Sequence, residues 1–116
     1  MNIHIKRIYE PFADTDGYRI LVDRLWPRGV KKENAHVDKW MKDVAPSTNL
    51  RKWFDHDAEK WDEFCLKYHS ELKGSAAVNE LMACLKEHKQ VTLLYAAKSE
   101  KYNHALALQQ FMKNVS

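Results

Sequence analysis

The first apolar pattern along the chain is an alternation. In the stretch IHIKRIYE, Ile3 and Ile5 alternate with His4 and Lys6, which predicts a half-exposed strand at or near the edge of a sheet. The turn signal DTDG at residues 14–17 then separates this strand from the next apolar run.

Two later runs are apolar without alternation. Ile20, Leu21 and Val22 are consecutive within YRILVDRLW, and QVTLLYAA at residues 90–97 is apolar almost throughout. Successive strand residues point to opposite faces, so we expect both runs to be strands that are covered on both faces, as in a parallel sheet.

Helical spacing of apolar residues predicts the remaining elements. The expected helices run over residues 48–54, 58–72, 76–86 and 103–113. Ser47, Asp57 and Ser75 precede the first three as N-caps, and Gly74 ends the second. The segment 33–45 fits either a helix or a short strand.

The order of strands and helices predicts the fold class. Strands separated by helices at these lengths indicate an α/β fold with a mainly parallel sheet flanked by helices. A chain of 116 residues is long enough for one hydrophobic core. We therefore expect a single compact α/β domain over residues 1–116.

Composition narrows the classes of protein that fit. The net charge is only +3, with acids and bases interspersed, which is far from what a protein that wraps a nucleic-acid backbone carries. Cys65 and Cys84 form no C-x-x-C pair, and no apolar stretch approaches the roughly 18 residues that a membrane span needs. With no apolar signal region at the start, a cytoplasmic location is expected.

Common cofactor and metal motifs are missing from the sequence. It contains no glycine-rich nucleotide loop, no G-x-S-x-G and no H-E-x-x-H. Asp55, His56 and Asp57 are adjacent, but three consecutive side chains do not readily turn toward one ion, and Asp57 is an expected cap. We therefore expect no metal site and no cofactor, with His56 as a loop histidine.

Polar residues gather after the two buried strands. In open parallel sheets, ligands bind where the strands end at their carboxyl side. The residues expected at this edge are Asp23, Arg24, Trp26 and Arg28 after the first buried strand, and Lys98, Ser99, Asn103 and His104 after the second. Arg51 and Tyr95 are further candidates from a short helix and from the end of a strand.

These residue types fit an anionic ligand. Arg24, Arg28 and Lys98 would hold the charge, Trp26 would stack on a ring, and Asp23 and His104 are the acid–base candidates for catalysis. The alternative is structural, since most charged side chains pair or are solvated at a surface.

Several blocks of the sequence resemble a known family. RILVDRLWPRG (19–29), KDVAPSTNLRKWFDHD (42–57) and VTLLYAAKSEKYNHALAL (91–108) are similar to the YeaO-like family of small bacterial proteins, catalogued as a domain of unknown function. The resemblance spans nearly the whole chain and implies a compact α/β cytoplasmic protein with no established activity. It does not support a methyltransferase, because the chain is short and lacks a glycine-rich loop.

A longer branch of that family differs at the expected site. The resemblance implies a cysteine at the position of Tyr95, an acid at Ala97, and Cys-His-Arg at residues 103–105, of which this chain keeps only His104. It therefore argues against covalent cysteine catalysis, while the shared position favours a site at these strand ends.

Three functions compete. The leading one is a pocket for a small anionic or phosphorylated, nucleotide-like ligand. The second is a nucleic-acid-binding module that uses a basic strip with Trp26; the strip consists of Lys6, Arg7, Arg28, Lys31 and Lys32. The third is a protein-interaction domain without a ligand, with Trp40 or Trp53 in the contact surface.

Overall fold

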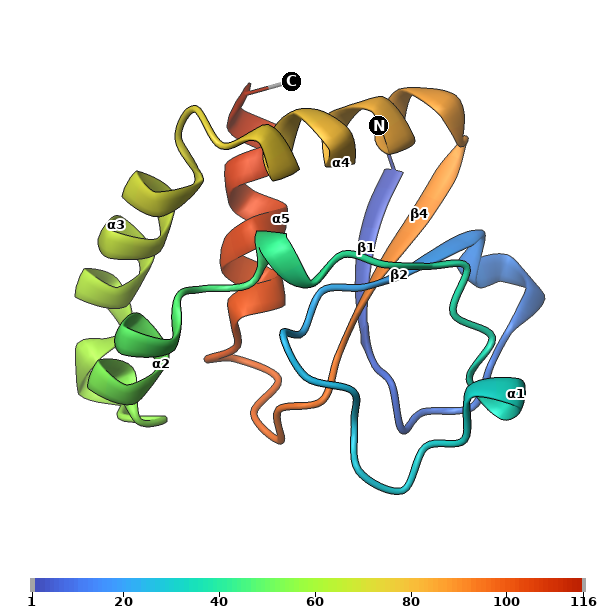
Figure 1. Cartoon of the computed structure of the whole chain (residues 1–116), viewed down its shortest axis with the longest axis horizontal. Helices are drawn as coiled ribbons and strands as arrows, with labels where there is room; N and C mark the ends of the chain where they lie inside the picture. Colours follow the sequence, from blue (N-terminus) through green and yellow to red (C-terminus); the bar gives the residue numbers. More distant parts are fainter. Residues whose placement is uncertain (1, 116) are drawn as a thin grey trace.

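A four-stranded parallel sheet forms the centre of the computed structural model, which describes residues 2–115 (Figure 1). Its strands are β1 (Asn2–Arg7), β2 (Tyr18–Leu21), β3 (Lys39–Trp40) and β4 (Gln90–Tyr95). They lie in the order β1–β4–β2–β3, and each neighbouring pair is parallel. The predicted α/β class is confirmed, and β1 is an edge strand as its alternation predicts.

The helices lie between and after the strands. They are α1 (Lys32–Ala35), α2 (Thr48–Phe54), α3 (Trp61–Leu72), α4 (Ala76–Glu87) and α5 (His104–Val115). Short 3-10 turns occupy Asp14–Asp16, Lys42–Val44 and Ala58–Lys60. The helix α5 packs on β1 and β4, α3 packs on α5, and α2 packs on α3 (Figure 1). Between residues 2 and 115, no helix is long and apolar enough to cross a membrane.

The consecutive apolar residues of the second strand divide between two cores. Ile20 and Val22 belong to the main core under the helices, whereas Leu21 belongs to a smaller cluster on the other face. None of these three side chains is exposed. The smaller cluster is covered by Trp26, Val30 and Val37 of the connection after β2 and by Trp40 of β3. The expectation of a strand covered on both faces is therefore confirmed.

The predicted caps are present. Ser47 accepts a hydrogen bond from the Leu50 amide, and Ser75 accepts one from the Ala77 amide. Asp57 also acts as a cap, but for a 3-10 turn that precedes α3, so the predicted helix over 58–72 starts with tighter winding. Each serine or aspartate side chain satisfies an amide that has no partner inside its helix.

The ends of some elements differ from the sequence prediction. The ambiguous segment 33–45 forms both a helix and a strand: most of the one-turn helix α1, the two-residue strand β3 and a 3-10 turn, with β3 pairing with β2. The last strand ends at Tyr95 instead of residue 97. The last helix begins at His104 rather than Asn103 and continues to Val115.

Candidate functional site

The loops after β2 and β4 lie side by side at the carboxyl edge of the sheet. The Ala96 amide donates to Asp23 Oδ2 at 2.9 Å, and the Val22 amide donates to the Leu94 carbonyl at 3.1 Å. Parallel neighbours end at the same edge, so this contact follows from the pairing of β2 with β4. The two polar segments expected to form one site are therefore adjacent.

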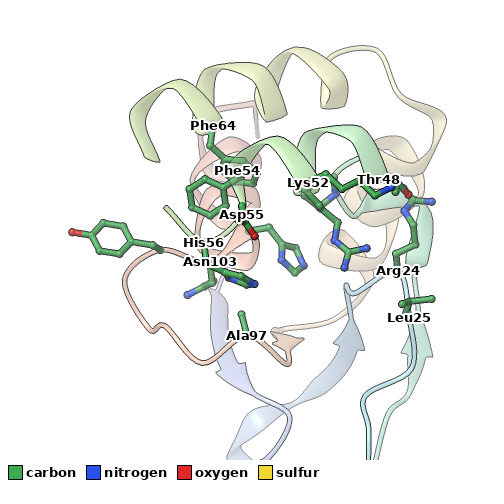
Figure 2. A pocket seen from close by; sticks show the side chains of 14 residues that line it. Arg24, Leu25, Thr48, Lys52, Phe54, Asp55, His56, Phe64, Ala97 and Asn103 are labelled. Carbon is green, nitrogen blue, oxygen red and sulfur yellow. The ribbon is translucent and has the colours of Figure 1, made fainter. Parts of the chain in front are cut away.

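Two overlapping hollows open at this edge. The strand-end hollow, of about 720 Å³, is lined by Asp23, Arg24, Leu25, Trp26, Pro27, Arg28, Ala45, Pro46, Arg51, His56, Ala96, Ala97, Lys98, Ser99 and His104. The helix hollow, of about 480 Å³, is lined by Arg24, Leu25, Pro46, Thr48, Arg51, Lys52, Phe54, Asp55, His56, Phe64, Ala97, Tyr102, Asn103 and His104 (Figure 2). Both volumes fall in the range of small-molecule sites.

Positive charge is concentrated in these hollows. Their lining contains five of the nineteen Lys and Arg residues and two of the sixteen Asp and Glu residues. The charges of the rest of the chain therefore cancel, and the whole formal net charge of +3 lies in the lining. The five cations are Arg24, Arg28, Arg51, Lys52 and Lys98.

The cations differ in how firmly the fold holds them. Arg24 Nη2 donates to the Ala45 carbonyl at 3.1 Å, and Arg24 Nε is buried without a hydrogen bond from the described residues. Arg28, Arg51 and Lys98 are exposed, and their side chains make no hydrogen bond or ion pair within residues 2–115. Lys52 is likewise exposed and without such a contact, so four of the five cations that line the hollows are free to contact a ligand.

Asp23 and His104, the predicted acid–base residues, lie together. His104 Nε2 is 3.0 Å from Asp23 Oδ1 and 3.0 Å from the Val22 carbonyl oxygen. One N–H cannot point at both, and its direction favours Val22, so Asp23 Oδ1 receives no well-aligned hydrogen bond from the described residues. The Asp23 side chain is 14% exposed and the His104 side chain is 16% exposed. The pair joins the loop after β2 to the start of α5.

Trp26 lines the strand-end hollow, but the fold already engages much of its side chain. Its indole N–H donates to the Val30 carbonyl at 2.7 Å, and its ring packs edge-on against Trp40 with centroids 5.5 Å apart. Lys32 Nζ lies 5.6 Å from the ring centroid. Trp26 is therefore part of the smaller core as well as of the site.

Ser99 and Asn103 line the hollows, yet their polar atoms serve the local backbone. Ser99 Oγ accepts from the Tyr102 amide at 3.0 Å. Asn103 Oδ1 accepts from the Leu106 amide at 2.8 Å, and Nδ2 donates to the Ser99 carbonyl at 3.0 Å. These bonds shape the loop after β4 and cap the start of α5.

Tyr95 lies apart from the other predicted site residues. It is 2% exposed, belongs to the main core and lines neither hollow. Burial, with the charges of Glu100 and Glu10 in addition, raises the pKa of its hydroxyl. The placement of Tyr95 in the ligand site is corrected, because β4 ends at this residue with its side chain on the helix-covered face of the sheet.

Sequence reasoning missed one wall of the site. Pro46, Thr48 and Lys52 line the hollows from α2 and the segment before it, and His56 lies in both linings. His56 has φ +56° and Asp55 has φ +46°, two adjacent left-handed positions without glycine. Such a conformation is rare and often marks a functional loop, but the letters alone do not show it.

The predicted basic strip is partly engaged by the fold. Lys6 pairs with Asp16 at 3.1 Å, and Arg7 donates to the carbonyls of Ala97 and Ala96 at 2.8 and 3.2 Å. The Arg7 bonds tie β1 to the loop after β4, and the Lys6 ion pair ties β1 to the 3-10 turn before β2. Lys31 is exposed and lines neither hollow.

The tryptophans expected in a protein contact are half-buried. Trp40 donates its indole N–H to the Asp23 carbonyl at 2.7 Å, and the Trp53 ring has Lys60 and Lys67 ammonium groups 5.1 Å from its centroid. Among residues 2–115, no group of three or more His, Cys, Asp or Glu side chains is placed to hold a metal ion.

Comparisons with known proteins identify relatives of the whole chain. The family model described as "DUF488-N3i: Inactive DUF488-N3 subclade" matches residues 2–115. The uncharacterized protein YeaO of Escherichia coli K12 is 43% identical over 99% of this chain and 100% of YeaO. The uncharacterized proteins Rv3073c of Mycobacterium tuberculosis H37Rv and Mb3100c of Mycobacterium bovis are each 42% identical over 95% of this chain and 92% of their own length. No solved structure matches the chain significantly. The chain therefore belongs to this family of small bacterial YeaO-like proteins.

Proposed function

We propose that the two hollows together bind a small anionic or phosphorylated, nucleotide-like ligand. The observation that carries the proposal is the concentration of the chain's entire formal net charge in their lining. A concave surface with several convergent cations raises the local concentration of anions. Solubility alone does not require the charges to gather in a concave surface.

The residue types favour phosphate-like groups. Arginine presents a planar fork of N–H donors that matches two oxygens of a phosphate or carboxylate, and lysine supplies a point charge. Arg28 and Lys98 come from opposite loops of the strand-end hollow, and Arg51 lines both hollows from α2. Their side chains make no hydrogen bond or ion pair with residues 2–115, so binding would break no contact of the described fold.

Binding is better supported than turnover. The carboxylate of Asp23 accepts a hydrogen bond from the Ala96 amide, and His104 Nε2 is directed at the Val22 carbonyl. Both side chains therefore already serve to hold neighbouring loops together. The description of the matching family as an inactive subclade agrees with this reading. In the proposed site, Asp23 and His104 position the walls, and their acid–base role stays a prediction.

A thermal-shift series tests the proposal. Inorganic phosphate, pyrophosphate and adenosine monophosphate are compared on the natural chain and on Arg28→Ala/Lys98→Ala. The matched control is Lys31→Ala/Lys101→Ala, which removes two exposed cations that line neither hollow. At a ligand concentration of about 100 times Kd, binding adds about 2.7 kcal/mol to the free energy of unfolding, which raises Tm.

We expect at least one of the phosphate probes to raise the Tm of the natural chain and of the control Lys31→Ala/Lys101→Ala, but not the Tm of Arg28→Ala/Lys98→Ala. No increase with any probe, or an equal increase in both double variants, would overturn the proposal. A single-stranded oligonucleotide is included, because its binding would weaken steeply with salt if many phosphates were contacted. Tight oligonucleotide binding without mononucleotide binding would replace the proposal with the nucleic-acid reading.

A further inference from the structure

Resting on the proposed function, we propose that the ligand is an aryl or nucleoside phosphate, with its ring in the helix hollow and its phosphate in the strand-end hollow. The two hollows overlap through shared residues, among them Arg24, Arg51 and His56. One molecule with a charged end and a flat end can therefore occupy both.

The two hollows differ in charge. Among the residues that line only the strand-end hollow, Arg28 and Lys98 are cations, and the one acid, Asp23, already accepts a backbone hydrogen bond. Among those that line only the helix hollow, Lys52 is balanced by Asp55. The anionic group therefore belongs at the strand ends, and the neutral part of the ligand belongs beside α2.

The helix hollow has an aromatic wall. Phe54 and Phe64 stack with centroids 4.4 Å apart and planes inclined by 29°, and both are largely buried, so the wall is held by the core. Figure 2 shows their rings on the helical side of the hollow, across from Ala97 and Asn103. Aromatic contacts of this kind favour a flat ring over a charged group.

Tyr102 completes the ring site at its rim. It is 37% exposed, and its ring packs edge-on against Trp61 with centroids 5.8 Å apart. Its hydroxyl makes no hydrogen bond within residues 2–115. An exposed tyrosine held by a second aromatic ring can cover one side of a bound ring at low cost in side-chain entropy.

Trp26, the stacking residue expected from the sequence, is less suitable. Its N–H is bound to Val30, its ring packs edge-on against Trp40, and it lies in the hollow that holds Arg28 and Lys98. A ring placed there would displace the anionic group from its cations. The bound ring is therefore expected to stack beside α2 and not on Trp26.

Matched probes test the inference directly. Methyl phosphate and phenyl phosphate carry the same charge, and their Kd values are measured by amide NMR titration of the natural chain. We expect phenyl phosphate to bind about tenfold more tightly, the factor expected from burying an aromatic face. Equal Kd values would overturn the inference and leave the proposed function standing. If neither probe binds, the proposed function fails, and the inference fails with it.

Two variants locate the ring. Thr48 is the exposed first residue of α2 and lines only the helix hollow, so Thr48→Trp should fill that hollow. In this variant we expect phenyl phosphate to bind no more tightly than methyl phosphate, and the Kd of methyl phosphate to stay within about twofold of its value for the natural chain. The control is the neighbouring Asn49→Trp, which lies outside both linings and should keep the tighter binding of phenyl phosphate. Tyr102→Ala, at an exposed site, should weaken phenyl phosphate by about fivefold. An undiminished preference in both Thr48→Trp and Tyr102→Ala would overturn the placement.

Discussion

His104 Nε2 lies 3.0 Å from Asp23 Oδ1, which brings the first residue of α5 against the loop that follows β2. The other oxygen of the same carboxylate accepts the Ala96 amide from the loop after β4. A single aspartate thus connects three segments that form the walls of the strand-end hollow. Asp23 lies just after β2 and bonds to Ala96 just after the neighbouring β4, so it holds the two loops together.

Replacing Asp23 with asparagine should destabilise the protein. Asparagine has one acceptor oxygen, so an NH₂ group would face either the Ala96 amide or His104 Nε2. The expected loss is about 1–3 kcal/mol in the free energy of unfolding, measured by urea denaturation. Asp43→Asn is the control, because Asp43 is exposed and makes no hydrogen bond within residues 2–115. Equal unfolding midpoints for the two variants would contradict this role.

Asp16 should make stability depend on acid pH. Burial by itself raises its pKa, but the hydrogen bonds from Lys6, the Ala13 amide and Arg19 together lower it below the usual 3.8. The unfolded carboxyl has the higher pKa, so the stabilisation is complete above the unfolded pKa and is lost as pH falls through the folded pKa.

The variant Asp16→Asn should reveal this dependence. The substitution leaves the buried Arg19 without its carboxylate partner. We therefore expect the free energy of unfolding to fall by about 3 kcal/mol at pH 7, and by less as the pH approaches 3. Urea unfolding at several pH values measures it, with the exposed Asp14→Asn from the same turn as control. If the free energies of unfolding of the natural chain and Asp16→Asn differ by the same amount from pH 7 to pH 3, the charge of the Asp16 carboxylate is not the source of the stabilisation.

The cysteine thiols should react slowly in the folded protein. Burial raises the pKa of Cys65 to about 11, with a smaller contribution from Asp62, and Cys84 is 8% exposed. At pH 8 only about one Cys65 thiol in a thousand is then ionised. Labelling with a thiol reagent should be at least about a hundredfold slower than in urea, and Cys84→Ala isolates Cys65. Comparable labelling rates in the folded and unfolded protein would contradict the raised pKa of the Cys65 thiol.

Most elements of the fold could be predicted, because local signals and packing agree. The run Ile20, Leu21 and Val22 predicts a strand that is covered on both faces. In the structure, Ile20 and Val22 pack in the main core under the helices, and Leu21 packs in the smaller cluster on the other face. Ser47 and Ser75 cap helices where the sequence places them. The adjacency of the two site loops followed from parallel strands ending at one edge.

The parts that could not be predicted depend on tertiary packing. Tyr95 shares the core face of β4 with Leu93, and no local signal shows that the strand stops there and not two residues later. His56 enters the site through two adjacent left-handed residues that turn the chain after α2. Residues of α2 and Phe64 of α3 line one side of the helix hollow, and the sequence carries no motif for the packing of α2 on α3.

Anion binding between the two loops can be tested by an amide NMR titration with pyrophosphate. We expect saturable shift changes for amides in residues 23–28 and 96–104, which are lost in Arg28→Ala/Lys98→Ala and kept in Lys31→Ala/Lys101→Ala. Shift changes that are absent, do not saturate, or lie outside both these segments and the residues that line the two hollows would contradict anion binding at this site.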